Sequence, residues 1–503
     1  MKPKKTDRKS MIMRFLKGSY LYFILAIATS MLYTVFNSLT PQVIRAMVDS
    51  IIGTEPFSLP QPVLTLIDQI GGREYIRYPI KMKKTKNRKK EDSDEYESYT
   101  EVDTLNSMVP IWRKNKSEIS HEDYCQFYKD KFFDYNDPLR VIHSSTEGAS
   151  TYNALLFIPE KPAFDYYSRD FEKGLQLYAS GVLIMDKCAD LLPDCFSFVR
   201  GLVDSQDLSL NISREMLQHD RQLKLIESRL EKKIKSELLS MLKNDREKYE
   251  TFWKGFGRQL KYGLYSSFGA NSELLSDLLL FYSSHEKKLS TLEEYIGRMP
   301  EDQKYIYYAC GDSLERIDQL PQAELVKDKG YEILYFTEDV DEFVTKMMPV
   351  YQEKEFRSVS SNDLGLESEK EKEETKKQQE QNKDLFGAIK EALGERVTEV
   401  RLSGRLKNAA CCLTAKGPVS LEMERVLGAM PGEQKVKAER VLELNPDHEI
   451  FPVLQKLYSE HKEDLADYAE LLYGQALIRE GMLPEDSAAF AAAMCRLMEQ
   501  KEK

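Results

Sequence analysis

The sequence lacks the cysteine pattern of a disulfide framework or a zinc site. Its seven cysteines are an odd number, and no two of them are spaced as Cys-x-x-Cys. Disulfide frameworks usually need even numbers, and structural zinc sites use closely spaced pairs. Vicinal Cys411 and Cys412, within AACCLTA, fit a buried strand of small hydrophobic residues. The cysteines therefore indicate a reducing compartment, with no bound metal.

An excess of basic charge is also lacking. The chain has 83 acidic and 72 basic residues, which gives a net charge of −11. Nucleic-acid-binding domains carry a basic surface, so no nucleic-acid partner is predicted. A length of 503 residues with 42% hydrophobic residues is enough for three or so domains with their own cores. The six histidines are scattered, and no Ser/His/Asp or Cys/His arrangement is present.

Charged residues are missing from residues 18–44. Residues 19–39 are apolar and long enough to cross a bilayer, and seven basic residues precede them against one acid. Membrane association through this segment is one expectation, and a buried core helix is the alternative. Residues 1–72 resemble the first transmembrane helix of an ABC exporter. No Walker A motif, GxxxxGK[ST], occurs in the sequence, which excludes a transporter as the function of the whole chain.

Two charged stretches have little apolar content. Lys81–Lys90 is basic and Glu91–Asp103 is acidic, a pattern that predicts a disordered linker within residues 73–103. Residues 358–383 are polar almost throughout and predict a solvated linker or a loosely held helix. These stretches separate a segment at 104–357 from one at 384–503.

The segment 104–357 alternates predicted strands and helices. RVIHSST, YNALLFIP, GLQLY and SGVLIM have the patterns of strands. A long helix is expected from Arg214 to about Lys243, because Leu223, Ile226 and Leu230 begin an apolar face. YIYYA and EILYF, separated by a helical stretch, indicate a second and smaller αβα unit.

The segment 384–503 is expected to be an α+β domain. VTEVRLS and AACCLTA have the patterns of short strands, and helices are predicted from Leu421, Phe451 and Asp464 and over Asp486–Gln500. The last helices contain many small and aliphatic residues, which suit a helical dimer interface. Ordinary core helices are the alternative reading of the same pattern.

The segment Leu208–Gln218 reads LSLNISREMLQ. A Ser or Asn here can cap a helix, and Glu215 suits the positive helix end. Arg214 is at the unfavourable end for a cation, which an external anion such as a phosphate would explain. The alternative is an exposed arginine at a helix start.

The ordered motifs resemble those of the heat shock protein 90 family of chaperones, of the bacterial HtpG type. They include TLNSMVPIWRKNKSEIS, FFDYNDPLRVIHSSTEG, the SREMLQ segment, FWKGFGRQLKYGL and ILYFTEDVDEF, and the likeness covers about residues 73–503. The resemblance implies a multidomain chain of mixed α+β and α/β class. It implies a middle domain of large and small αβα units and a C-terminal dimerisation domain. The isolated apolar helix expected at the N-terminus is not part of this resemblance and follows from the apolar residues 19–39.

The resemblance also implies roles for individual residues. In the family, ATP with magnesium drives a weakly hydrolysing chaperone cycle. Arg214 matches the arginine that reaches the ATP γ-phosphate, with Gln218 and Asn211 beside it in the same catalytic segment. The nucleotide pocket of the family has no counterpart in this sequence, where DxGxG is missing. ATP turnover by these 503 residues alone is therefore not expected, and the chain is predicted to bind no cofactor.

Two apolar stripes are candidates for binding non-native client proteins. One contains Met423, Leu427 and Met430, and the other contains Phe343 and Met347. Flexible methionine surfaces suit varied partners, and the family uses both regions to hold polypeptide. Burial in a core is the alternative for each stripe.

The predicted function is therefore a homodimeric, cytoplasmic molecular chaperone that binds unfolded or partly folded proteins. The alternative is a membrane-tethered module that holds or scaffolds partners without ATP.

Overall fold

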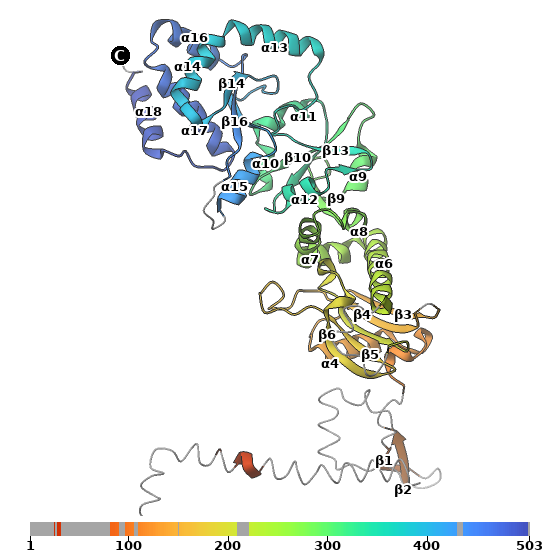
Figure 1. Cartoon of the computed structure of the whole chain (residues 1–503). Helices are drawn as coiled ribbons and strands as arrows, with labels where there is room; N and C mark the ends of the chain where they lie inside the picture. The colour runs from red at the N-terminus through yellow and green to blue at the C-terminus, as the bar shows by residue number, and fades with distance from the viewer. Residues whose placement is uncertain are drawn as a thin grey trace, which may run out of the picture. The chain divides into compact units, whose positions relative to one another are not determined.

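The protein is a mixed α/β chain with several sheets, seen in a computed structural model (Figure 1). The described residues are 25, 28–31, 81–89, 96–104, 109–148, 150–208, 221–429 and 436–500. The chain divides into two compact units. One comprises residues 1–138 with 143–145 and 153–155, and the other comprises the remaining residues.

Little of the apolar N-terminal segment is described. Leu25 and residues 28–31 are helical and exposed, and the Thr29 hydroxyl donates to the Leu25 carbonyl at 2.9 Å. The rest of the candidate membrane segment 19–39 lies outside the described residues. Within the described ranges, no helix is both long enough and apolar enough to cross a membrane.

The expectation of a disordered linker is wrong for residues 81–89 and 96–103, which form two strands. Strand β1 (Lys81–Lys89) pairs antiparallel with β2 (Tyr96–Thr104). The register places residue types of opposite charge opposite each other, as at Lys84–Glu101 and Arg88–Glu97. Opposite charges across a strand pair are stabilising, so a basic and an acidic segment that each repel themselves favour pairing with one another.

In the first unit, helix α4 (His121–Phe132) begins with a capping box. The Ser120 hydroxyl accepts from the Asp123 backbone N–H, and the Asp123 carboxylate accepts from the Ser120 backbone N–H. Trp112 lies in the 3-10 turn η2 (Ile111–Arg113) and is 1% exposed, so it is a packing residue of this unit. A second turn, η3 (Lys116–Glu118), connects η2 to α4.

His143 joins the parts of this unit. Its Nε2 is 3.1 Å from the Trp112 carbonyl oxygen and its Nδ1 is 2.7 Å from the Tyr124 hydroxyl. A carbonyl only accepts, so Nε2 carries the proton and Nδ1 accepts from the tyrosine. Burial lowers the pKa of His143, which keeps the imidazole neutral in this position.

The four strands predicted in the first half of the 104–357 segment form one five-stranded sheet with β7, a strand that was not predicted, in the order β3-β4-β7-β5-β6. Their bounds are β3 Arg140–Thr146, β4 Tyr152–Ile158, β5 Leu175–Ala179, β6 Val182–Cys188 and β7 Arg200–Ser205. The 3-10 turns η4 (Ala189–Leu191) and η5 (Asp194–Phe196) connect β6 to β7. Strand β5 is parallel to β7 and antiparallel to β6.

Two long helices follow the sheet. Helix α6 (Arg221–Asn244) buries the apolar face that the sequence predicted, and the part of that helix expected before Arg221 lies outside the described residues. Helix α7 (Arg246–Ser266) is capped by the Asp245 carboxylate, which accepts from the Lys248 N–H at 3.3 Å. It buries four aromatic residues, Tyr249, Phe252, Trp253 and Phe256.

The smaller αβα unit contains a mixed six-stranded sheet in the order β12-β13-β10-β11-β8-β9. Its strands are β8 Leu280–Ser283, β9 Leu289–Thr291, β10 Tyr305–Cys310, β11 Ile333–Phe336, β12 Val350–Tyr351 and β13 Lys354–Ser358. The predicted strands YIYYA and EILYF are parallel neighbours, β10 and β11. Parallel neighbours need a crossover, and the helical stretch between them supplies it.

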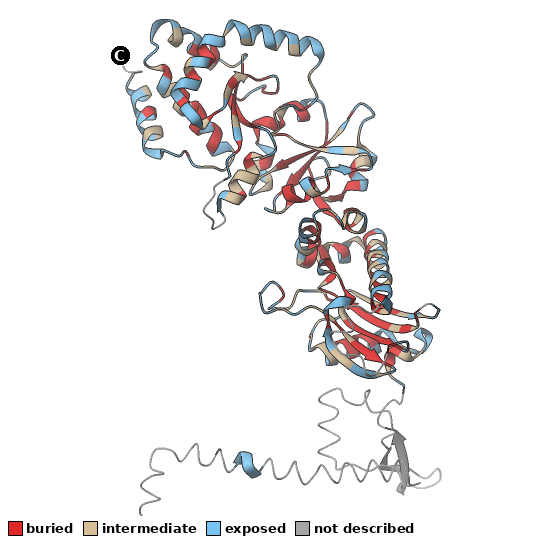
Figure 2. Ribbon diagram, in the orientation of Figure 1, coloured by how far each residue is buried: buried red, intermediate tan, exposed pale blue. Residues whose placement is uncertain are grey.

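Short helices surround this sheet. They are α8 Ser272–Leu275, η6 Ser276–Leu278, α9 Leu292–Arg298, α10 Leu314–Asp318, η7 Pro321–Ala323, α11 Glu324–Asp328 and α12 Asp341–Met347. Burial follows the strands and the inward helix faces (Figure 2).

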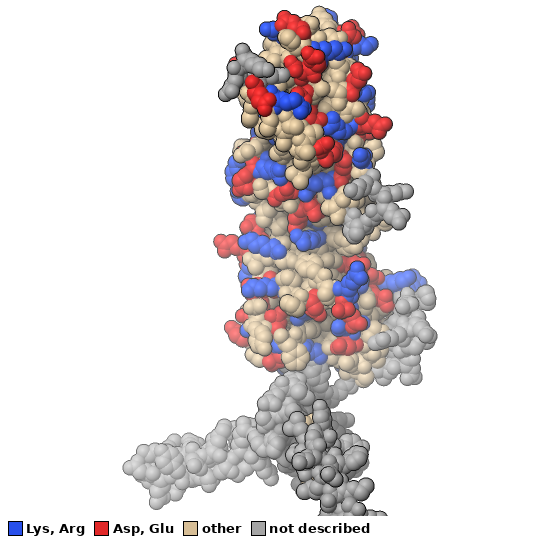
Figure 3. Space-filling model, turned by 90° about the vertical axis from the view of Figure 1, so that its left-hand side faces the viewer, with Lys and Arg blue, Asp and Glu red and all other residues tan. Residues whose placement is uncertain are grey.

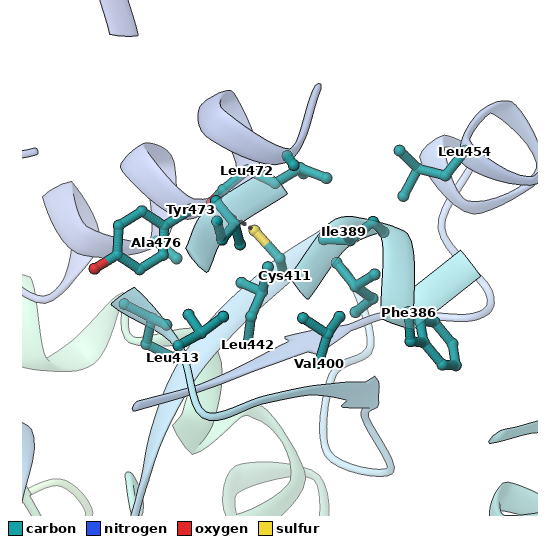
Figure 4. Packing of buried hydrophobic residues seen from close by; sticks show 14 of the residues in the cluster. Phe386, Ile389, Val400, Cys411, Leu413, Leu442, Leu454, Leu472, Tyr473 and Ala476 are labelled. Atoms are coloured by element: carbon teal, nitrogen blue, oxygen red, sulfur yellow. Dashed lines mark hydrogen bonds between the residues drawn. The ribbon is translucent and has the colours of Figure 1, made fainter. Parts of the chain in front are cut away.

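The C-terminal part of the chain contains a three-stranded sheet in the order β14-β16-β15. Its strands are β14 Glu399–Leu402, β15 Cys411–Lys416 and β16 Glu439–Leu444. Its helices are α13 Glu369–Gln381, α14 Lys383–Leu393, η8 Gly394–Arg396, α15 Leu421–Ala429, α16 Ile450–Glu460, α17 Leu465–Arg479 and α18 Ser487–Gln500. The core lies between the sheet and helices α14 and α17, where Ile389, Cys411 and Tyr473 meet (Figure 4). The prediction that Cys411 and Cys412 lie on a buried strand is confirmed.

The polar stretch at 358–383 contains helix α13, one of the two forms that the sequence left open. Its capping box joins Ser368 and Glu371, and none of its residues is buried. The Gln379 side chain holds its last turn, because it donates to the Val400 carbonyl at 3.3 Å and accepts from the Leu402 N–H at 2.7 Å.

Candidate functional site

The catalytic candidates Asn211, Arg214 and Gln218 lie outside the described residues. The structure describes the two ends of the segment that carries them. The segment follows β7, which ends at Ser205. The chain is described again from Arg221, where α6 begins.

Both ends of this segment are attached to one turn. On the β7 side, the Gln206 N–H donates to the Thr151 carbonyl at 3.1 Å, and the Thr151 N–H donates to the Asp207 carboxylate at 2.5 Å. On the α6 side, Arg229 donates to the Ser150 carbonyl at 3.3 Å. Residues 150–151 therefore contact both the residues that follow β7 and Arg229 of α6, which lie on either side of the segment that carries Arg214.

Helix α12 carries the apolar stripe that contains Phe343 and Met347. A buried lysine attaches this helix to α7. Lys261 Nζ lies 2.6 Å from Asp341 and 2.7 Å from Glu338, and its side chain is 5% exposed. The ammonium group also lies over the rings of Trp253 and Phe281, at 5.3 and 5.2 Å from their centroids. Burial lowers the pKa of Lys261, but the two carboxylates more than offset that effect, so the lysine stays charged.

The two client-binding candidates on α12 differ in exposure. Phe343 is buried, and its ring packs edge-on against Tyr265 at 5.7 Å. Met347 is half-buried, while the next residue, Met348, is buried. Of this stripe, Met347 is thus the candidate that remains partly accessible.

The other stripe lies on α15, where Met423 and Leu427 are half-buried and Val426 is buried. Met430 lies outside the described residues. The Ser420 hydroxyl, just before α15, donates to the Glu342 carboxylate of α12 at 2.5 Å. The fold therefore brings together two helices that are almost eighty residues apart in the sequence.

Charged groups reinforce this pairing of α12 and α15. Glu342 also accepts from the Tyr308 hydroxyl at 3.2 Å. Burial raises the pKa of Glu342, while the bonds from Ser420 and Tyr308 oppose that rise. Arg425 of α15 contacts Asp312 at 2.9 Å and Asp339 at 3.2 Å, so it links α15 to the loops beside α10 and α12.

Three exposed aromatic residues at the end of α7 and just after it were not predicted as functional from the sequence. Tyr262 is 50% exposed, Tyr265 is 40% exposed and Phe268 is 82% exposed. Their spacing of three residues places the two tyrosines on one face of α7. In the sequence, the signal for this tyrosine pair is its three-residue spacing, which places the pair on the face of α7 opposite to the buried Phe252 and Phe256.

Helix α18 carries an exposed apolar face. Met494 and Met498, one turn apart, are 39% and 63% exposed, and Leu483 before the helix is 82% exposed. Phe490 of α18 packs against α17. Its ring lies so close to Gly474 that a Cβ on this glycine would collide with the ring. Small residues thus allow α17 and α18 to pack closely while the methionines face outward.

Among the described residues, no three His, Cys, Asp or Glu side chains are placed to bind a metal ion together. All seven cysteines are free thiols. On the face drawn in Figure 3, acidic and basic side chains are interspersed without a large area of one sign.

Comparison with known proteins finds a match over most of the chain. The family model described as Hsp90 protein matches residues 79–503. The chain is 59% identical over 426 residues to the chaperone protein HtpG of Bacillus subtilis (strain 168). The aligned residues cover 84% of this chain and 68% of that protein. The HtpG proteins of Clostridium acetobutylicum and Clostridium perfringens (strain ATCC 13124) are 59% and 58% identical over the same shares.

Proposed function

The chain belongs to the Hsp90 protein family and has the function of a molecular chaperone, and from this premise we propose that it holds non-native polypeptides on the surface formed by α12 and α15. The observation that carries this proposal is the pairing of the two helices through Ser420 and Glu342. It places Met347, Met423 and Leu427, all half-buried, on adjoining helices. Flexible thioether side chains adapt to many apolar partners.

A chaperone assay tests this surface. The chain should suppress aggregation of a thermally unfolded model protein, followed by light scattering, without ATP. Replacing Met347, Met423 and Leu427 by Ser should weaken client affinity about tenfold, because each apolar side chain contributes about 1–3 kcal/mol when fully buried and these start half-buried.

The control is Val453→Ser on α16, at a residue that is 39% exposed and lies on another helix. If the triple variant suppresses aggregation as well as the parent chain does, the proposal is refuted. Loss of folding in the triple variant, seen by circular dichroism, would show that the stripes are core and would refute it equally.

A nucleotide role for Arg214 is a further part of this proposal. Its support is the resemblance of SREMLQ to the family motif and the attachment of both ends of its segment to residues 150–151. We propose that Arg214, with Asn211 and Gln218, faces an ATP γ-phosphate when a nucleotide domain is present. The guanidinium would there neutralise charge that develops on the transferred phosphoryl group.

Holding by these 503 residues should need no nucleotide, because the sequence contains no DxGxG motif. Phosphate release from ATP with magnesium is the measurement. Turnover that Arg214→Ala abolishes would contradict this expectation.

We also propose a homodimer formed through the C-terminal domain and a cytoplasmic location. The exposed methionines of α18 support the first, and seven free cysteines suit a reducing compartment. The membrane-tethered alternative finds no support in the comparisons, whose curated relatives are named chaperones.

A further inference from the structure

The solvent face of α7 carries a row of basic and aromatic side chains. Lys254, Arg258, Tyr262 and Tyr265 follow one another at spacings of four, four and three residues, which places them on one helix face. All four are exposed, while the opposite face is buried in the protein. An exposed aromatic pair on a helix whose other aromatics are buried is not required by the core.

The aromatic end of this row continues onto α12. The ring centroids of Tyr262 and Tyr265 are 6.2 Å apart, and Tyr265 packs edge-on against Phe343 at 5.7 Å. Beyond α7, Gly269 lies directly against the Met347 carbonyl, where a Cβ would collide with that oxygen. The row therefore reaches Met347, which belongs to the surface already proposed to hold clients.

Phe268 extends the row in a strained conformation. It has a φ of 50°, which is costly for a bulky residue, and its side chain is 82% exposed. Its N–H donates to the Tyr265 carbonyl at 3.1 Å, and the Gly269 N–H donates to the Leu264 carbonyl at 3.1 Å. These backbone bonds stabilise the turn that follows α7 and carries the exposed ring.

The relative placement of α7 and α12 is fixed by the buried Lys261. Its bonds to Glu338 and Asp341 attach the start of α12 to the middle of α7. A surface composed of both helices is thus pre-formed, so a partner that binds it does not have to order it.

The charge around this row is basic. Lys254 and Arg258 are exposed on α7, and Lys346 is exposed on α12. The neighbouring acids are already paired, because Glu338 contacts Lys261 at 2.7 Å and Asp339 contacts Arg425 at 3.2 Å. Arg258 lies 3.6 Å from Glu338, but its side chain is 69% exposed.

A cavity of about 370 Å³ opens at the basic end of the row. It is lined by Trp253, Lys254, Arg258, Phe281 and Tyr335 among others. Its size falls within the range of pockets that enclose a small ligand or an anchoring side chain.

We propose that the solvent face of α7, with Phe268, is a second polypeptide-binding track that selects extended segments carrying acidic residues next to aromatic or aliphatic ones. The aromatic row stacks the apolar side chains, and Lys254 and Arg258 attract the carboxylates. The proposal rests on the chaperone function and specifies the chemistry of the clients.

Peptide binding to the full chain tests the track. Two short fluorescein-labelled peptides share the same Leu and Phe residues, and one carries aspartates where the other carries lysines. Fluorescence anisotropy should show the aspartate peptide bound about tenfold more tightly. The variant Tyr262→Ser with Phe268→Ser should weaken both peptides about tenfold, since two largely exposed rings are removed while Tyr265, which covers the buried Phe343, is kept.

Charge reversal provides the second variant. Lys254→Glu with Arg258→Glu should invert the preference between the two peptides, whereas Lys456→Glu with Lys462→Glu, a matched pair on and beside α16, should preserve it. Parent-like binding of both peptides by the aromatic and charge variants overturns the track. If the triple Ser variant at Met347, Met423 and Leu427 then loses peptide binding, the surface formed by α12 and α15 is supported and the track on α7 is not. If the parent binds neither peptide, both proposals fail.

Discussion

Individual buried charges in this protein join elements that are distant in the sequence. Glu443 of β16 is 1% exposed and contacts Arg405 at 3.0 Å, while Arg401 also donates to it. Burial raises the pKa of Glu443, but the two arginines outweigh that effect and lower it. Arg405 also donates to the Val359 carbonyl at 2.8 Å, so one carboxylate organises the contact between the last domain and the chain that precedes it.

Lys261 has the same role between α7 and α12. Lys261→Met should destabilise the protein by about 3–5 kcal/mol, because it removes the buried cation that neutralises the carboxylates of Asp341 and Glu338. The urea midpoint of unfolding measures this. Adding Asp341→Leu should recover part of the loss, and the exposed Lys254→Met should change the free energy of unfolding by no more than about 0.5 kcal/mol. An unchanged midpoint for Lys261→Met would contradict the role assigned to it.

Glu480, at the end of α17, makes stability depend on pH near neutrality. Burial, with Glu422 nearby, raises its pKa to about 7, although the bond from Gln322 and the charge of Arg316 act in the opposite direction. Since the folded-state pKa lies above the ordinary value of 4.5, folding favours the protonated acid. The stability from this group is fully present below about pH 4.5 and is lost as the pH rises through 7.

Glu480→Gln should therefore raise Tm by roughly a few degrees at pH 8 and change it little at pH 5. Differential scanning calorimetry at both pH values is the measurement, with the exposed Glu460→Gln as control. A variant that melts with the parent at pH 8 would show that Glu480 is charged at no cost.

At the scale of elements, helix α13 is held by a few polar contacts rather than by apolar burial. Helix α13 buries no residue, and its formation depends on the Ser368–Glu371 capping box and on Gln379. Such an element opens locally at low cost, because few contacts are lost when it does.

Gln379→Ala should release the last turn of α13 from β14. Amide exchange over residues 369–381 should then accelerate, while Tm stays the same because no core contact is removed. Hydrogen exchange with mass spectrometry measures this, and Gln378→Ala, one position away on the exposed face, is the matched control. Equal exchange rates in parent and Gln379→Ala would mean that other contacts hold the helix.

At the scale of the whole molecule, the exposed methionines of α18 are the surface on which dimerisation is expected. Met494→Glu with Met498→Glu should convert a dimer into a monomer at micromolar concentration, because two carboxylates would be desolvated at the interface. Light scattering on the eluted full chain gives the mass. Val453→Glu on α16 should leave the mass unchanged, and a parent chain that is itself monomeric would refute the proposed interface.

Much of this architecture could be predicted from local sequence patterns. The period of α6 predicted its buried face, and the apolar runs YIYYA and EILYF predicted two neighbouring strands. The motif series was sufficient to place the chain in its family, because motif order is a property of the sequence alone. The mixed α/β class followed from the alternation of such patterns along the chain.

Tertiary structure decided the rest, because pairing and burial depend on residues that are distant in the sequence. Charge runs predicted disorder at 81–103, yet a basic and an acidic run form a hairpin. Phe343 and Met347 belong to one sequence stripe, but Tyr265 covers the first and leaves the second partly accessible. The approach of α12 to α15 and the partners of Lys261 likewise could not be read from spacing. Periodicity specifies the face a residue occupies, and only the packed neighbours determine whether that face meets solvent, a core or a partner.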